Sequence, residues 1–534
     1  MSQVLTAAPQ RQRHAPLAPG APEPTASRRV WRPAPWLVGA ALYALSWPVL
    51  DGVALSFLAW GAFVPLLVEL ERHDRFAPFA LRVVAFMGLA GLVSCWWWFA
   101  SVPAEFRVLA WAGGAHEILL TAVPLLLLFP LRKALSYDRA LAALVPLWPL
   151  WEWAYNHWEL SISSLVLGYS QAGTVWLVQY ADLFGVWALT AWVVGFNVVL
   201  TLAYRKLGWS RPFRIRGLKL AAVLLAVPLA YAGLRAAAVA PSDVLRVSAV
   251  YTDFEPIPNA DGGLRISRAT HLTDSVAYYA TEAPELYVWP ESAIPFAWTD
   301  ESQPFLQQAV ADWQTPLLSG HSGLAAQSDG DSVRFNRAVL LAPDADGASP
   351  IYDKRRLMPF KEGLPHERVL GAVPALASYR DRERLIAAGQ RATTFSIVRP
   401  DGEVVRVATP ICHEQQFPGL WAGWARDGTD LFVHLSFESW FGERAFWPHF
   451  LNITRVRAIE SRRSVVRVSN GGPTAVIDGF GTVVEQGRGS EGAITESVAL
   501  YRGQTLYAKA PWLFPLLCVL ALGGVLAGAR LRRL

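Results

Sequence analysis

The sequence predicts an α/β layered domain inserted in a polytopic membrane domain of eight transmembrane helices. Composition is the first reason, because 53% of the residues are hydrophobic and only 17% are charged, where an ordinary soluble domain has roughly 25% charged residues. Seven apolar runs near the length that crosses a bilayer precede residue 240, and an eighth closes the chain. Between them, short β-like runs alternate with helical stretches in a segment rich in charge and turns.

Composition divides the chain into four parts. Residues 1–32 are rich in Pro, Ala and Arg without periodicity, so we expect a disordered cytoplasmic tail there. No short apolar core with a cleavage site follows its charges, which excludes a signal peptide. Residues 33–239 are the membrane domain, 240–508 the α/β domain, and 509–534 a last transmembrane helix with a cytoplasmic tail. The helices are expected near 35–50, 52–70, 78–100, 108–130, 140–155, 182–203, 217–238 and 511–529.

Lysine and arginine gather in alternate loops, which predicts the orientation of the helices. Both tails and the loops near 71–75, 132–139 and 205–216 carry these residues, whereas the loops at 51–52, 101–106 and 156–180 are poor in them. A chain that starts in the cytoplasm and crosses the membrane seven times places 240–508 on the outer side. One weak run that fails to span would reverse this orientation, but the positive charge of both tails argues against that alternative.

Within 240–508, short apolar or β-branched runs bounded by turns are predicted to be strands. Asp401-Gly402 and Asp478-Gly479 are typical of hairpin turns. Strands that alternate with helices favour a layered α/β sheet. The strands are expected at 245–251, 286–289, 338–341, 404–411, 431–435 and 464–468, and two helices at 266–280 and 448–462.

Three strand ends carry reactive side chains, namely Glu291, Lys354 and Cys412. Singly, each has an ordinary explanation as a turn, a solvated surface charge or a core residue. Together they make chemical sense, because a thiol is mostly protonated at neutral pH and needs a base or a cation nearby. A carboxylate can take the proton, and an ammonium can stabilise the thiolate and the oxyanion formed on attack at a carbonyl. The other cysteines, Cys95 and Cys518, lie in apolar runs, and no CxxC or Cys/His cluster indicates a metal.

At these residues the chain resembles the nitrilase, or carbon-nitrogen hydrolase, superfamily. The similar segments are WPES at Glu291, YDKRRLMPFKEGLP at Lys354 and PICHE at Cys412. Together with the predicted membrane helices, the chain resembles the apolipoprotein N-acyltransferase family. Gly168-Tyr169-Ser170-Gln171 also matches that family. The resemblance implies that the α/β domain is a nitrilase-like αββα sandwich.

The resemblance also implies a role for each site residue. Glu291 would be the general base, Lys354 the transition-state stabiliser and Cys412 the nucleophile of a Glu–Lys–Cys triad. Five further side chains are expected to bind substrate or to support the triad. They are Glu362, which would help to position the triad; Glu414, the acidic residue two positions after the cysteine; Trp440, near the acyl pocket; His413, which could tune the thiolate or line the pocket; and Trp289.

The activity implied is a ping-pong acyl transfer at a bacterial inner membrane. Cys412 would take an acyl chain from a phospholipid and pass it, through a thioester, to the α-amino group of the diacylglyceryl-cysteine that begins an apolipoprotein. We expect a multi-pass monomer with its catalytic domain in the periplasm, and we expect no cofactor, no metal and no nucleic-acid partner.

Several departures from the family pattern surround the expected pocket. His413 stands where tyrosine is common, Phe437-Glu438 replaces Asn-Asp, and Ser163-Ser164 replaces Pro-Trp. These changes leave alternatives open: a membrane-tethered amidase or nitrilase-like hydrolase with water as acceptor, an acyltransferase with another acceptor, or an inactive scaffold.

Overall fold

A computed structural model describes most of the chain. Its contacts separate Met1–Ala34 from one compact unit, Pro35–Leu534. The tail predicted at 1–32 and the turn at Asp51-Gly52 lie outside the described residues. The described residues are 34–48, 55–102, 104, 107–208, 210–255, 262–294, 302–326, 332–344, 350–374, 386–441 and 444–530.

Two six-stranded sheets form the α/β part of the molecule. In each sheet three adjacent strands are parallel to one another, and every other pair of neighbouring strands is antiparallel. The first sheet has the order β12 (Gly492–Leu500), β1 (Asp243–Tyr251), β2 (Leu286–Val288), β3 (Leu317–Ala326), β4 (Ser332–Leu341), β5 (Ile351–Asp353). The second has the order β11 (Val483–Gln486), β10 (Ala475–Ile477), β9 (Ser464–Asn470), β8 (Leu431–Phe437), β7 (Val404–Ala408), β6 (Thr394–Val398).

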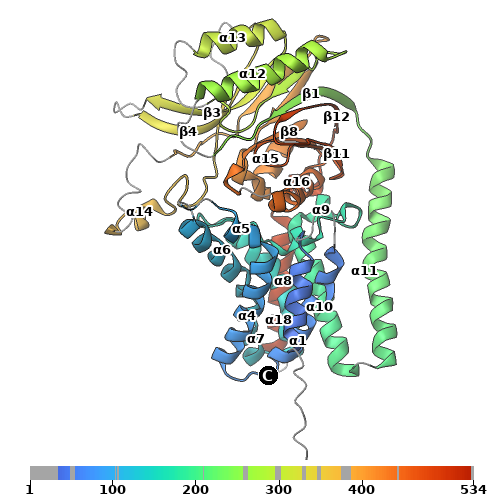
Figure 1. The fold of residues 1–534 in the computed structure, drawn as a ribbon. Coiled ribbons are helices and arrows are strands. Elements are labelled where there is room, and N and C mark those ends of the chain that lie inside the picture. The colour runs from blue at the N-terminus through green and yellow to red at the C-terminus, as the bar shows by residue number, and fades with distance from the viewer. Residues whose placement is uncertain are drawn as a thin grey trace, which may run out of the picture. The chain divides into compact units, whose positions relative to one another are not determined.

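The sheets pack face to face, with helices on their outer faces (Figure 1). One apolar core joins strand residues of both sheets, such as Leu245 and Val466. A second core lies between the first sheet and helices α12 (Gly262–Tyr279) and α13 (Ser302–Trp313). Helices α15 (Pro418–Arg426) and α16 (Trp447–Ser461) cover the other sheet. Every residue of β8 and β9 is buried, as expected for strands covered on both faces. The predicted αββα sandwich is therefore confirmed.

The six strands predicted from sequence are all present, and both predicted helices appear as α12 and α16. Asp401-Gly402 joins β6 to β7, and Asp478 begins the turn between β10 and β11. The remaining strands and helices α13 and α15 were not predicted. Short helical elements complete this part: α14 (Glu367–Leu370), η6 (Cys412–Gln416), η7 (Ser439–Phe441) and η8 (Arg444–Phe446).

The rest of the described chain is almost entirely helical. Three helical segments are long and apolar enough to cross a membrane by length and composition: Phe76–Ser94, Arg107–Ala134 and Val186–Leu207. Four shorter apolar helical segments, Pro35–Leu45, Ser56–Leu70, Ala222–Ala238 and Leu513–Gly528, fall on other predicted spans. The elements are α1 (Pro35–Leu45), η1 (Ser56–Leu58), α2 (Ala59–Ala62), α3 (Val64–Leu70), α4 (Phe76–Ser94), α5 (Trp96–Ala100), α6 (Arg107–Thr121), α7 (Val123–Ala134), α8 (Tyr137–Asn156), η3 (Leu167–Gln171), η4 (Val175–Leu177), α9 (Ala181–Phe184), α10 (Val186–Leu207), α11 (Arg211–Ala238), α17 (Leu506–Lys509) and α18 (Leu513–Arg530).

The segment that follows α8 joins the helices to the sandwich through buried hydrogen bonds. Asn156 donates to the Gln416 carbonyl over 2.9 Å, and Gln416 donates to the Ser164 hydroxyl over 2.8 Å. His449 bonds the Ser164 carbonyl at 3.0 Å. Gln416 lies four residues after Cys412. Ser163 and Ser164 thus lie against η6, the short helix that begins at Cys412, and Asn156 also donates to the Ser163 hydroxyl.

Candidate active site

Cys412 occupies a strained backbone position at the start of η6. Its φ is +50°, a region that residues other than glycine rarely adopt and that recurs at functional sites. A hydrogen bond of 3.0 Å between His434 Nε2 and the Cys412 carbonyl helps to hold this conformation. Arg467 can only donate, and it bonds His434 Nδ1 at 2.6 Å, so the His434 proton sits on Nε2 and points at Cys412. The backbone of Cys412 is therefore held through its own carbonyl.

Glu291 lies just beyond β2, close to β3. A Cβ at Gly320 would lie 2.5 Å from the Glu291 Cα, so only glycine allows the two backbones this approach. The carboxylate is 5% exposed. Its Oε1 accepts a hydrogen bond of 2.6 Å from Asn336 Nδ2, while its Oε2 has no hydrogen-bond partner in the described structure. One oxygen is thus fixed and the other is free to take a proton.

Lys354 follows β5 and is fully buried. Its backbone N–H donates to the Asn336 carbonyl over 2.8 Å. Its Nζ lies 2.7 Å from Glu362 Oε1 and 4.0 Å from Glu291 Oε1. Glu362 is fixed in turn by the Met358 N–H over 2.7 Å and by Asn336 Nδ2 over 3.2 Å. One ammonium therefore links the two carboxylates that face the cysteine.

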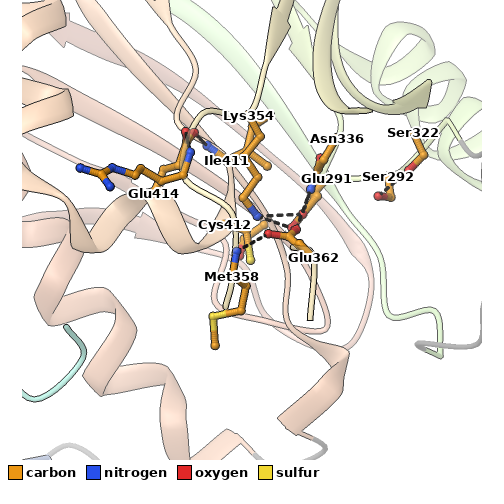
Figure 2. A network of polar contacts seen from close by, with 12 residues as sticks. Glu291, Ser292, Ser322, Asn336, Lys354, Met358, Glu362, Ile411, Cys412 and Glu414 are labelled. Atoms are coloured by element: carbon orange, nitrogen blue, oxygen red, sulfur yellow. Dashed lines mark hydrogen bonds and ion pairs between the residues drawn. The ribbon is translucent and has the colours of Figure 1, made fainter. Parts of the chain in front are cut away.

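Figure 2 shows the side chains of Cys412, Lys354, Glu291 and Glu362 gathered in one place, from loops of both sheets. All four line a cavity of about 390 Å³, within the range of small-molecule sites. The remaining wall is mostly apolar and includes residues of α5 and α6. Examples are Trp98, Leu109, Ile162, Met358, Phe441 and Phe450.

Burial sets the resting protonation of the thiol. It raises the pKa of Cys412 to about 12, and the nearby Glu291 carboxylate acts in the same direction. Burial also raises the pKa of Glu291, although Lys354 partly offsets this effect. The resting site therefore holds a thiol rather than a thiolate, and a base must remove its proton during attack. The free oxygen of Glu291 is suited to that task.

Lys354 stays charged for the opposite reason. Burial alone would lower its pKa, but Glu362, Cys412 and Glu291 raise it above the usual lysine value. Burial likewise acts to raise the pKa of Glu362, yet the charge and hydrogen bond of Lys354 bring it below the ordinary carboxyl range. Lys354 and Glu362 therefore form a buried ion pair next to a neutral thiol. The Lys354 ammonium provides a fixed positive charge where an oxyanion would form on the substrate.

Glu414 ties two loops of the site together rather than facing the cavity. Its Oε1 accepts from the Tyr352 hydroxyl at 2.8 Å and from the N–H groups of Arg355 and Arg356 at 2.8 and 3.1 Å. Its Oε2 accepts from the Ile411 N–H at 2.8 Å. The carboxylate thus connects the chain around Lys354 to the chain around Cys412.

Replacing Glu414 with alanine should lower the free energy of unfolding by about 3 kcal/mol or more, because several buried donors lose their acceptor at about 1–3 kcal/mol each. Thermal unfolding in detergent, followed by tryptophan fluorescence, would measure this loss. Glu414→Gln keeps one carbonyl oxygen and should lose less. Glu403→Ala, at an exposed position, should stay within about 0.5 kcal/mol of wild type. Equal stability of Glu414→Ala and Glu403→Ala would contradict the assigned role.

Of the remaining predicted site residues, two line the cavity and one does not. His413 and Trp440 line the cavity. Burial, with a smaller effect of Lys354, lowers the pKa of His413 to about 3, so this ring is a neutral wall residue and carries no charge to the thiol. Trp289 does not line the cavity: it is buried in the core beneath α12 and donates to the Thr273 hydroxyl over 2.9 Å.

Sequence reasoning missed Asn336, Lys361, His434 and Arg467. Asn336 lies within β4 in the segment RFNRAV, and a buried amide in a strand is a weak signal of function. Lys361 lines the cavity directly before Glu362. Among the described residues, no group of three or more His, Cys, Asp or Glu could hold a metal ion.

Two family models match the chain: Carbon-nitrogen hydrolase over residues 260–506, and Apolipoprotein N-acyltransferase N-terminal domain over 39–199. A protein named apolipoprotein N-acyltransferase from Chlorobaculum tepidum is 32% identical over 92% of this chain and 95% of its own. One from Geobacter metallireducens is 28% identical over 93% and 95%. Among solved structures, Saccharomyces cerevisiae Nit3, of branch 10 of the nitrilase superfamily, is 18% identical over 48% of this chain and 91% of its own, with a TM-score of 0.37.

Proposed function

The chain belongs to the apolipoprotein N-acyltransferase family, and from this premise we propose that Glu291, Lys354 and Cys412 transfer an acyl chain from a phospholipid to the N-terminal amine of a diacylated apolipoprotein. One observation carries the assignment of residues. A half-buried thiol, a carboxylate with a free oxygen and an ammonium held by carboxylates all line one largely apolar cavity. Nucleophilic acyl transfer needs these three groups.

In the first half-reaction, Cys412 Sγ attacks the ester carbonyl of the phospholipid. Glu291 Oε2 takes the thiol proton, and the Lys354 ammonium stabilises the oxyanion of the tetrahedral intermediate. The carbon–oxygen bond of the ester then breaks. Glu291 returns the proton to the departing lysophospholipid oxygen, and the acyl chain remains as a thioester on Cys412.

In the second half-reaction, the neutral amine of the acceptor attacks the thioester carbonyl. Glu291 takes a proton from the attacking nitrogen and delivers it to sulfur as the carbon–sulfur bond breaks. The products are an amide on the acceptor and the resting thiol. The same base and the same ammonium serve both steps, because both pass through a tetrahedral oxyanion.

The other site residues support this chemistry. Glu362 holds Lys354, Glu414 joins the two catalytic loops, and His413 and Trp440 form walls beside the acyl chain. Trp289 supports Glu291 from the core. The apolar wall contributed by α5 and α6 suits a chain that enters from the lipid. We propose that the protein acts as a monomer.

We also propose that the protein is a multi-pass enzyme of a bacterial inner membrane, with eight spans and the α/β domain at 240–508 in the periplasm. The three long apolar helical segments and four shorter ones support seven of these spans, and α8 would be the eighth. So does the alternation of positively charged loops in the sequence. Both substrates would then meet the site at the outer leaflet.

A two-step assay with the purified protein tests the function. Phospholipid labelled in its acyl chain is added first, and a diacylated lipopeptide second. We expect the label to appear on the peptide as an amide, and a lipopeptide with an acetylated N-terminus to receive none. Release of label as free fatty acid at the same rate with and without peptide would instead support a hydrolase. Absence of any labelled protein would support a scaffold.

A further inference from the structure

A second lysine, Lys361, stands on the wall of the catalytic cavity. A tight turn presents it: the N–H groups of Lys361 and Glu362 donate to the Met358 carbonyl over 3.3 and 3.0 Å, and the Phe360 N–H donates to the Gly363 carbonyl over 2.8 Å. Glu362 points inward to Lys354, whereas Lys361 is exposed. Its Nζ lies 3.7 Å from the centroid of the Trp440 ring.

Lys354 and Lys361 differ in the groups that surround their ammonium charges. Lys354 is paired with Glu362 at 2.7 Å and faces Glu291 at 4.0 Å. Lys361 forms no ion pair within the described part of the chain and rests on an aromatic ring, which attracts a cation without neutralising it. An anion brought by a substrate would favour the charged form of Lys361.

The two substrates of the proposed reaction differ in the charge near the reacting carbon. The phospholipid donor carries a phosphate one glycerol unit away from each acyl ester. The acceptor carries an amine at the reacting centre. A cation on the cavity wall would attract the first and oppose an ammonium on the second.

We propose that Lys361, held against Trp440, binds the phosphate of the phospholipid donor and so selects that substrate in the first half-reaction. This inference rests on the proposed function and adds a specificity-determining residue to it. An ammonium is a common partner for a phosphate oxygen, and such charge-assisted hydrogen bonds are among the stronger ones in proteins.

The test compares two palmitoyl donors in detergent micelles: dipalmitoyl phosphatidylglycerol, and p-nitrophenyl palmitate, which has no phosphate. Initial rates of thioester formation on Cys412 give kcat/KM for each donor, and their ratio measures the preference for phosphate. We expect Lys361→Met to lower this ratio about tenfold or more, mainly through KM for the phospholipid. Lys361→Arg should restore most of the ratio, because a guanidinium also stacks on tryptophan and binds phosphate.

Lys509→Met is the matched control. Lys509 is an exposed lysine of α17, and its replacement should leave the ratio at the wild-type value. An unchanged ratio in Lys361→Met would overturn the proposal. So would an equal loss with both donors, which would place Lys361 at the reacting centre instead. Failure of the underlying function is distinguishable, since the wild-type protein would then form no thioester with phospholipid, or would pass the acyl chain to water rather than to the lipopeptide.

Discussion

Replacing Cys412 with alanine should abolish the acyl-enzyme and lower acyl transfer by at least about 10⁴-fold. Removal of a catalytic nucleophile has effects of this order, because the remaining residues cannot form the covalent intermediate. The fold should survive, since alanine keeps the Cβ and places no new group in the cavity. Mass spectrometry of the peptide that contains residue 412, after incubation with phospholipid, would measure the adduct directly.

The chain provides its own controls for this experiment. Cys95 and Cys518 are buried in the helical part, and the Cys95 thiol donates to the Gly91 carbonyl over 2.8 Å. Cys95→Ala and Cys518→Ala should keep the adduct on Cys412. A Cys412→Ala protein that still transferred palmitate to a lipopeptide would rule out the thioester route.

The sequence singles out Glu291, Lys354 and Cys412 because each follows a recognisable local pattern at a strand end, and all three line one cavity. Their catalytic roles stay a proposal. Glu291 follows β2 of the first sheet and Cys412 follows β7 of the second, so the face-to-face packing of the two sheets brings them to one cavity even though 121 residues separate them (412 − 291). Their burial and their partners could not be predicted, because Asn336 bonds Glu291 across 45 residues of sequence and His434 bonds Cys412 across 22. Such side-chain contacts leave no local pattern in the sequence.

Four of the strands that sequence analysis missed have sequences or lengths that hide them. β3 reads LLSGHSGLAA and β12 reads GAITESVAL, and neither has an uninterrupted apolar or alternating run. β3 contains Gly320, whose missing Cβ admits Glu291, so the residue that weakened the strand pattern is one that the site requires. β10 and β5 have only three residues each, too few for a periodicity.

The helical part shows a similar limit. The run predicted at 140–155 is a helix from Tyr137 to Asn156 with Pro146 and Pro149 inside it, and these prolines obscured its ends in the sequence. The long segment after it was expected only to be an outer loop. It instead packs under η6, where His413 bonds the Ser161 carbonyl at 3.3 Å and Gln416 the Ser164 hydroxyl. The serines at 161–164 gave no signal of this contact by themselves.

Lys354→Met should slow formation of the thioester by about two to three orders of magnitude. A preorganised charge that stabilises an oxyanion has effects of this size, and Lys354 is the buried ammonium held between the carboxylates of Glu291 and Glu362. The same change leaves Glu362 buried without its cation. We therefore expect a loss of stability of about 3–5 kcal/mol as well. Mass spectrometry of Cys412 in samples quenched at successive times gives the rate of thioester formation. Thermal unfolding in detergent gives the stability.

A second variant separates these two effects. In Lys354→Met with Glu362→Gln, no charge of the pair remains, and the amide oxygen can still accept from the Met358 N–H, which donates to Glu362 over 2.7 Å in the wild-type protein. Stability should recover in large part, while the acylation rate should stay low because the oxyanion still lacks its ammonium. Recovery of both in the double variant would mean that Lys354 serves the fold rather than the reaction. A wild-type acylation rate in the single variant would refute the catalytic role directly.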